Sequence, residues 1–236
     1  MGTDITFMVE EKSADGTWKL TSPLEKNLDY DPEDPDLKDE IEENMTELPD
    51  ELNICVTNKV SLRLMCRDDS KEFNRMVDRN RSDLRIWLTW VDEVTSEEDI
   101  KSRYDKCSTS KSEGKSLRFF VLHKGSIIGM LAAKRIDWES SLAELSYSLD
   151  PNFRGCGIMT KACRKLIGYL ESSLEIRNFE IHTAIGNQAS ERVAEKLGFK
   201  FNKIQEKAER LHSKWIDHKI YVIDNRVATK ISNGNT

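Results

Sequence analysis

The residues best suited to chemistry lie in a short glycine-bearing loop, residues 150–160, with the sequence DPNFRGCGIMT. An alternating, strand-like segment (141–149) precedes the loop, and an amphipathic segment (158–174) follows it. Glycines let the backbone approach a ligand closely, and the N–H groups and dipole of a helix start favour an anion. Arg154 adds a positive charge beside them. The pattern therefore predicts a phosphate-binding loop.

The glycine spacing does not say which phosphate compound binds. A Walker loop requires Gly-x-x-x-x-Gly-Lys-Ser/Thr, and a dinucleotide fingerprint requires Gly-x-Gly-x-x-Gly. After Gly155 and Gly157, the next glycine is Gly168, so neither motif is present here. An ordinary turn is the alternative interpretation of the glycine pair.

The elements around the loop predict an α+β domain. Strands are expected at 60–65, 116–123, 126–138, 142–149, 179–185, 201–211 and 215–223, from alternation and turn signals such as Lys124-Gly125. Helices are expected at 71–79, 95–108 (opened by a capping box of Thr95 with Glu98), 158–174 and 188–197, the last closed by Gly198. This order favours a mixed sheet covered by helices.

Charge divides the 236-residue chain, whose net charge is −6. Residues 25–51 hold 13 acidic and 2 basic side chains, whereas residues 52–236 carry a net charge of +7. An acidic, proline-punctuated segment cannot bury enough apolar surface to offset the entropy of ordering. We therefore expect a largely disordered acidic extension (1–51) with a small hairpin from 5–9 and 16–20, a folded domain (52–224) and a flexible tail (225–236).

Composition also excludes several classes of function. The sequence lacks an apolar run of eighteen residues and a basic-then-apolar leader, so neither a membrane span nor a secretory signal is predicted. Its five scattered cysteines and four histidines form no ligand pattern, which favours a cytoplasmic protein with reduced thiols and no metal. No basic stripe with interleaved aromatic residues is present, which argues against nucleic-acid binding.

Several segments in the same order resemble the GNAT superfamily of acetyl-CoA-dependent N-acetyltransferases, and within it the RimJ/RimL-type branch. The loop resembles the family's Arg/Gln-x-x-Gly-x-Gly/Ala motif from Arg154 to Ile158, although Met159 departs from its sixth place. The branch often has Gly-x-Gly-Ile/Leu-Met-Thr/Ser, which residues 155–160 match. Further matches lie at 88–91 (LTWV), 96–99 (SEED), 143–149 (AELSYSL), 187–190 (NQAS) and 195–199 (EKLGF), within a resemblance that covers residues 58–224.

The resemblance implies a GNAT fold: a mixed, mostly antiparallel central sheet with a splayed pair of strands, flanked by helices on both faces. It also implies acetyl-CoA as the acetyl donor, with the pyrophosphate on the loop and the pantetheine arm beside the splayed strand. For Arg192, a solvent-facing helix position is the alternative. The residues it assigns to the cofactor are Tyr147, Ser148, Leu149, Arg154, Gly155, Cys156, Gly157, Ile158, Met159, Thr160, Asn187, Ser190 and Arg192.

Acetyl transfer requires a neutral amine, so a base or a water chain must remove the ammonium proton. The resemblance favours two carboxylates as candidate bases, Glu144 and Glu209; the alternative for each is a structural role in its strand. A backbone N–H near Leu149 is the expected oxyanion donor. Many relatives have a tyrosine acid where this chain has Ala194, so Ser190 or a water is expected to protonate the leaving thiolate.

The acceptor is the least determined part. The resemblance to RimL-like proteins places a reactive cysteine where this chain has Thr183, which favours direct attack in a ternary complex. Trp87, Trp90 and Trp215 are candidate acceptor contacts, with core packing as the alternative for each tryptophan.

The predicted function is acetyl transfer to a primary amine, either a protein N-terminal amine or a small amine, by a monomer or homodimer. A catalytically silent acyl-CoA-binding module whose acidic arm docks a partner is the alternative.

Overall fold

The computed structural model describes residues 9–12, 18–21 and 48–223. The described strands are β1 (Val9–Lys12), β2 (Trp18–Thr21), β3 (Asn53–Thr57), β4 (Val60–Leu64), β5 (Leu117–His123), β6 (Ser126–Asp137), β7 (Leu142–Leu149), β8 (Asn178–Ala184), β9 (Lys200–Leu211) and β10 (Lys214–Ile223). The helices are α2 (Ser70–Arg79), α3 (Arg81–Leu84), α4 (Glu97–Ser112), α5 (Ile158–Ser173) and α6 (Gln188–Lys196), with 3-10 turns η1 (Arg67–Asp69), η2 (Thr89–Glu93) and η3 (Pro151–Phe153).

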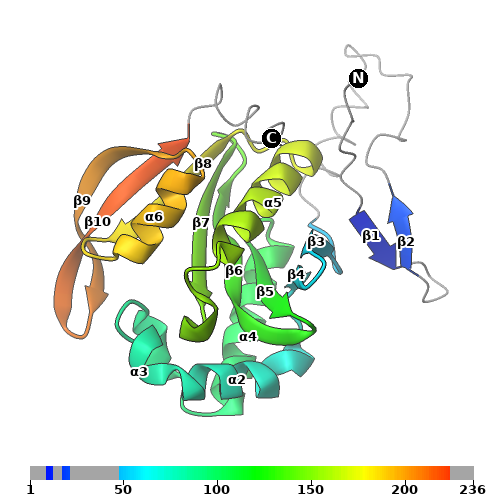
Figure 1. The fold of residues 1–236 in the computed structure, drawn as a ribbon, viewed down its shortest axis with the longest axis horizontal. Helices are drawn as coiled ribbons and strands as arrows, with labels where there is room; N and C mark the ends of the chain where they lie inside the picture. Colours follow the sequence, from blue (N-terminus) through cyan, green and yellow to red (C-terminus); the bar gives the residue numbers. More distant parts are fainter. Residues whose placement is uncertain (1–8, 13–17, 22–47, 224–236) are drawn as a thin grey trace.

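These strands form one mixed sheet in the order β2-β1-β3-β4-β5-β6-β7-β8-β10-β9 (Figure 1). Neighbours are antiparallel except β7 and β8, which run parallel and are connected through α5. A parallel pair requires such a crossover, usually through a helix. The mixed, mostly antiparallel sheet predicted from the sequence is confirmed.

Helices cover both faces of the sheet. On one face, α5 buries a long apolar row, including Leu166 and Leu170, against Leu145 and Phe179 of the central strands. On the other face, Phe73 and Met76 of α2 pack with Phe120 of β5 in a second cluster that also includes α4. Because strand side chains alternate between faces, β7 contributes Leu145 to the α5 face and Glu144 to the opposite one.

The parallel strands β7 and β8 separate part-way along their length. They pair from Leu142 with Asn178 to Leu145 with Ile181, and each strand then continues without the other. The splayed pair expected from the resemblance is therefore confirmed. The open end of this V lies at the carboxyl ends of β7 and β8, next to the glycine loop.

Most predicted elements are present, although the short helix α3 and the 3-10 turns were not predicted, and three further differences concern the longer elements. The strand β3 was not predicted, and α4 runs four residues further than expected, to Ser112. The capping box is also one position later than predicted: Ser96, rather than Thr95, caps α4 reciprocally with Asp99.

At the N-terminus, β1 and β2 pair as a hairpin close to the predicted one, and β1 meets β3 at Glu10 and Asn53. The remaining calls on the acidic extension and the C-terminal tail concern 1–8, 13–17, 22–47 and 224–236, which lie outside the described residues. Leu48 is already buried in the core. No described helix is both long and apolar enough to cross a membrane.

Candidate active site

A cavity of about 370 Å³ lies at the open end of the V. Its walls come from the end of β7, the glycine loop, the start of α5, one side of α6 and the α3 corner. The residues that line it are Asp83, Leu84, Trp87, Leu88, Tyr147, Ser148, Leu149, Phe153, Arg154, Gly155, Gly157, Ile158, Met159, Thr160, Asn187, Ala189, Ser190, Arg192, Val193 and Lys196. Twelve of the thirteen predicted cofactor residues are thus brought together.

The glycine loop is built to present backbone N–H groups. Gly155 and Gly157 have φ values of +79° and +74°, a left-handed conformation that side chains disfavour. A Cβ at either position would meet no atom within 4 Å. Glycine is therefore required by the backbone conformation and not by a lack of space for a side chain. Gly157 is the N-cap residue of α5, and no side chain caps this helix. The N–H groups of the first turn can therefore bind an anion.

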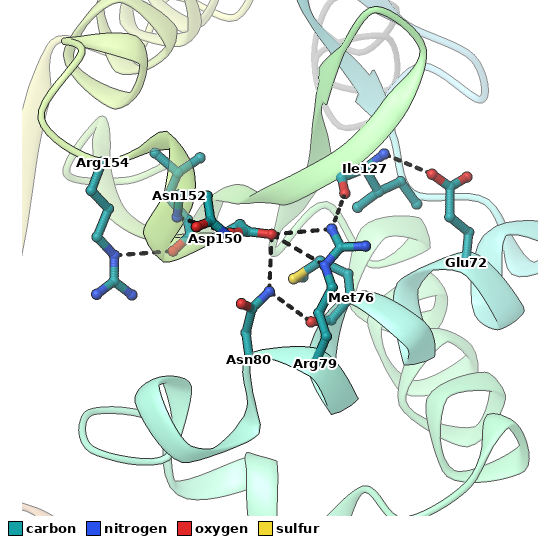
Figure 2. A network of polar contacts seen from close by, with 9 residues as sticks. Glu72, Met76, Arg79, Asn80, Ile127, Asp150, Asn152 and Arg154 are labelled. Carbon is teal, nitrogen blue, oxygen red and sulfur yellow. Dashed lines mark hydrogen bonds and ion pairs between the residues drawn. The ribbon is translucent and has the colours of Figure 1, made fainter.

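A buried carboxylate fastens this loop to the rest of the domain (Figure 2). Asp150 is only 2% exposed and follows β7 directly. Its Oδ2 accepts hydrogen bonds from Nε and Nη2 of Arg79 (3.2 and 3.1 Å) and from Nδ2 of Asn80 (3.0 Å). Its Oδ1 accepts from the backbone N and Nδ2 of Asn152, both at 3.0 Å. The end of α2 and the start of the loop therefore share one anchor.

Arg154 is held at both ends of its guanidinium. Its Nε donates to the carbonyl oxygen of Leu149 at 3.1 Å, while its terminal nitrogens point away from Asp150 (Figure 2). Nη1 donates to Oδ1 of Asp83 at 3.1 Å, and Nη2 donates to Oδ2 of the same carboxylate. Asp83 is a cavity residue that the sequence did not indicate.

The helix α6 supplies a second polar wall. Oδ1 of Asn187 accepts from the backbone N of Ser190 and so caps the helix. The Ser190 hydroxyl lies 3.1 Å from the Tyr147 hydroxyl, whose pKa is raised by burial, so that the phenol stays protonated. Arg192 lines the cavity but is exposed, so its predicted cofactor role and the solvent-facing alternative both stay open; Lys196 adds a cation that sequence reasoning missed.

On the sheet face opposite α5 lies a polar cluster, defined by Lys134, Glu144, Glu180, His182, Glu209 and His218. Glu144 is 6% exposed, and Nζ of Lys134 lies 2.6 Å from its Oε1. The ring of His182 lies between two carboxylates, with Nδ1 3.6 Å from Glu144 and Nε2 2.9 Å from Glu180. Burial acts to raise the pKa of Glu144, but the bond and charge of Lys134, with smaller help from His182 and Arg135, hold it below its ordinary value.

Glu209 approaches the same face from β9. Its Oε1 accepts a hydrogen bond from the Thr89 hydroxyl at 3.1 Å, and its Oε2 lies 3.5 Å from Nε2 of His218. The interaction with His218 lowers the pKa of Glu209, burial opposes it, and Thr89 and the charge of Lys134 add to the lowering. Both predicted carboxylates therefore belong to one cluster. Lys134, His182 and His218 were not predicted.

A family model described as an acetyltransferase (GNAT) domain matches residues 59–200. The chain belongs to the GNAT acetyltransferase family. A ribosomal-protein-serine acetyltransferase of Escherichia coli is 27% identical over 175 residues, which cover 73% of this chain and 98% of that protein.

Two solved acetyltransferases share the fold. RimL, described as a ribosomal L7/L12 alpha-N-protein acetyltransferase in complex with coenzyme A, superposes with a TM-score of 0.70 at 25% identity, covering 72% of this chain and 97% of RimL. MccE, a microcin C7 self-immunity acetyltransferase in complex with acetyl-CoA and AMP, also gives 0.70 at 26% identity, covering 75% and 98%. This GNAT protein is accordingly an acetyl-CoA-dependent N-acetyltransferase.

The cavity of this GNAT enzyme fits its acetyl donor. The loop offers left-handed glycines and an uncapped helix start for the pyrophosphate, with Arg154, Arg192 and Lys196 around it. Thr183 lies two residues beyond the last β7–β8 pair, and its buried hydroxyl has no hydrogen-bond partner among the described residues. Thr183 does not line the cavity, so its hydroxyl is not a contact for the acetyl donor. Among the described residues, no group of three or more His, Cys, Asp or Glu could hold a metal ion.

The three tryptophans predicted to contact the acceptor lie in different places in this acetyltransferase. Trp87 lines the cavity, and its ring reaches to 4.0 Å from where a Cβ of Gly186 would lie. Trp90 instead packs with Phe73 and under Arg103 in the second core, which is the core-packing alternative. Trp215 is 59% exposed and, like Cys156, is not among the residues that line the cavity.

Proposed function

We propose that this enzyme transfers the acetyl group of acetyl-CoA to a protein N-terminal amine, by direct attack in a ternary complex. One observation carries the proposal: the polar cluster lies next to the point where β7 and β8 separate, because its Glu144 and Glu180 form the last pair but one, and the cavity is lined by the end of β7 beyond that point. An amine that approaches from the polar-cluster face would therefore meet a thioester held in the V.

Direct attack is favoured because the cysteines of the domain are poorly placed for a covalent route. Thr183 occupies the position at which the resemblance to RimL-like proteins places a reactive cysteine. Burial raises the pKa of the Cys163 thiol, which keeps it protonated and unreactive. Cys156 is exposed on the loop and does not line the cavity.

Of the two carboxylates, Glu209 is the better acceptor of the amine's proton. Glu144 is already bound to the Lys134 ammonium at 2.6 Å, so its charge is largely matched, and we assign it a positioning role. Glu209 is more exposed, and among the described residues its oxygens are contacted by a hydroxyl, of Thr89, and by an imidazole, of His218. With its pKa below the ordinary value, Glu209 attracts an ammonium and passes the proton on, to His218 or to water.

The leaving thiolate requires a proton at the end of the reaction. Ser190 lines the cavity; its hydroxyl donates to the Tyr147 oxygen at 3.1 Å, and the Tyr147 hydroxyl donates to the Ser190 carbonyl oxygen at 3.2 Å. We assign this step to Ser190 or to a water, as expected from the sequence; Ser190 would have to turn its hydroxyl from Tyr147 toward the thiolate in order to donate.

The test is a thiol-release assay with acetyl-CoA against peptides with free N-termini, polyamines and arylalkylamines. We expect turnover on peptides and little on the small amines. Preference for a polyamine or an arylalkylamine would instead support the small-amine alternative. Tight acetyl-CoA binding without turnover on any amine would support the catalytically silent module.

Two matched variants test the roles of the carboxylates. Glu209→Gln should lower kcat by about a hundredfold, the scale of general-base catalysis, and leave acetyl-CoA affinity unchanged. Glu144→Gln should lower kcat by a smaller factor, again without abolishing acetyl-CoA binding. Unchanged rates in both variants would refute both assignments.

A further inference from the structure

The carboxylate of Asp83 differs in the sign of its charge from the other charged residues of the cavity. The other charged residues of the lining are Arg154, Arg192 and Lys196, all cations suited to a polyanion. Asp83 is about one-third exposed and binds the Arg154 guanidinium through both terminal nitrogens. Such a fork-to-fork pair uses the same edge of the guanidinium that bidentate recognition of a phosphate uses.

We propose that Asp83 competes with the pyrophosphate of acetyl-CoA for Arg154, so that the cofactor must displace this carboxylate in order to bind fully. The inference rests on the proposed assignment of Arg154 to the pyrophosphate and goes beyond it. Asp83 acts in two ways: it occupies the donors of Arg154, and it places a negative charge beside the phosphates. Both lower the affinity for acetyl-CoA.

The other contacts of the Arg154 side chain and its loop do not depend on Asp83. The bond from Nε to the Leu149 carbonyl does not involve Asp83 and fixes the base of the guanidinium in either state. The loop itself is held by Asp150, through Asn152, independently of Asp83. Only the two terminal nitrogens need to change partner.

The chain provides a close control in Asp92. This carboxylate also binds an arginine through two nitrogens, Nε and Nη2 of Arg85 at 2.9 and 2.8 Å, and it follows Asp83 by nine residues. Asp92 and Arg85 do not line the cavity. Removal of the Asp92 charge therefore shows how the loss of a surface ion pair outside the cavity affects the affinity for coenzyme A.

The experiment is titration calorimetry of coenzyme A into the full chain and its variants, which needs no acceptor and no turnover. Asp83→Asn should lower the Kd by about three- to fivefold, the range set by a partly exposed ion pair. Asp83→Ala should do the same, and Asp92→Asn should leave the Kd unchanged. In the Arg154→Ala background, Asp83→Asn should improve the affinity for coenzyme A only through the relief of charge repulsion. This improvement should be smaller than the one in the wild-type background.

The outcomes separate this inference from the site assignment. An unchanged Kd in Asp83→Asn overturns the competition, and a raised Kd shows instead that Asp83 orients Arg154 for the phosphate. If Arg154→Ala does not weaken coenzyme A binding, the assignment of the loop itself is wrong. Thermal unfolding by circular dichroism checks that each variant is folded.

Discussion

The buried carboxylate of Asp150 offers the sharpest test of how the cofactor loop is held. Asp150→Asn keeps the size of the side chain and removes its charge. Both carboxylate oxygens accept hydrogen bonds, Oδ2 from Arg79 and Asn80 and Oδ1 from Asn152. Whichever way the new amide turns, its N–H₂ group faces donors. The substitution therefore cannot keep both halves of the network.

The expected cost follows from the exposure of each partner. The Arg79 side chain is 52% exposed and can be solvated again, so its share stays below about 1 kcal/mol. Asn80 is buried, and with the new N–H₂ group turned toward it the Asn80 amide keeps its bond to the Met76 carbonyl and loses the other; a lost bond to a charged group costs about 1.5–3 kcal/mol. The opposite orientation loses the two bonds from Asn152 instead. We expect Asp150→Asn to lower the free energy of unfolding by about 3 kcal/mol.

Urea unfolding at pH 7 measures this difference, with Asp78→Asn as the control. Asp78 lies on the same helix and pairs with Arg81 at the surface, so its loss should cost below about 1 kcal/mol. Coenzyme A affinity should fall in Asp150→Asn and stay unchanged in Asp78→Asn. A cost for Asp150→Asn as small as that of the control would refute the anchoring role.

The pH dependence gives an independent check. Burial acts to raise the pKa of Asp150, but hydrogen bonds from Asn152, Asn80 and Arg79 outweigh it and lower the pKa. A carboxyl with a depressed folded-state pKa stabilises the protein above its unfolded pKa of about 3.9, and this is lost as the pH falls through the folded value. The difference in the free energy of unfolding between the wild type and Asp150→Asn should therefore be largest at pH 7 and become smaller below about pH 4.

Two further outcomes are expected. In Gly129→Ala the new Cβ would lie 2.3 Å from the backbone oxygen of Ser148, so β6 and β7 must move apart; the free energy of unfolding should fall by about 2–3 kcal/mol in urea titrations. Gly125→Ala, with φ +84° and open space, should cost only about 1–2 kcal/mol, and equal costs would refute the clash. Acetyl-CoA should slow alkylation of Cys156 in the loop, read by peptide mass spectrometry, and leave the equally exposed Cys55 unaffected; equal protection of both thiols would argue against binding at the loop.

The parts of the site that sequence reasoning found are local. The glycine loop lies on consecutive residues, and its helix start, strand and arginine could be identified without a fold. Glu144 and Glu209 were named separately, from the resemblance, and only the pairing of β9 with β10 and of β10 with β8 places them on one face. Their separation along the chain hid that they share Lys134 as a neighbour.

What could not be predicted depends on contacts between distant segments. Asp83 and Arg154 are 71 residues apart, and neither position carries a periodic signal for the other. The capping box was misplaced because Thr95 with Glu98 and Ser96 with Asp99 both fit the local pattern, and only the helix geometry selects the second pair. The strand β3 was missed because its five residues do not alternate in burial.

The segment from α3 to η2 has a consequence for anyone who redesigns this enzyme. At one end Asp83 binds the cofactor loop, and at the other Thr89 and the Arg85 carbonyl bind Glu209 and His212 of the β9–β10 hairpin. Exchanging this segment for that of a relative, to import a new amine preference, would replace a cofactor contact at the same time. Cofactor and acceptor contacts are therefore inherited together in such a graft, and retaining Asp83 alone does not separate them, because Trp87 and Leu88 of the same segment also line the cofactor cavity.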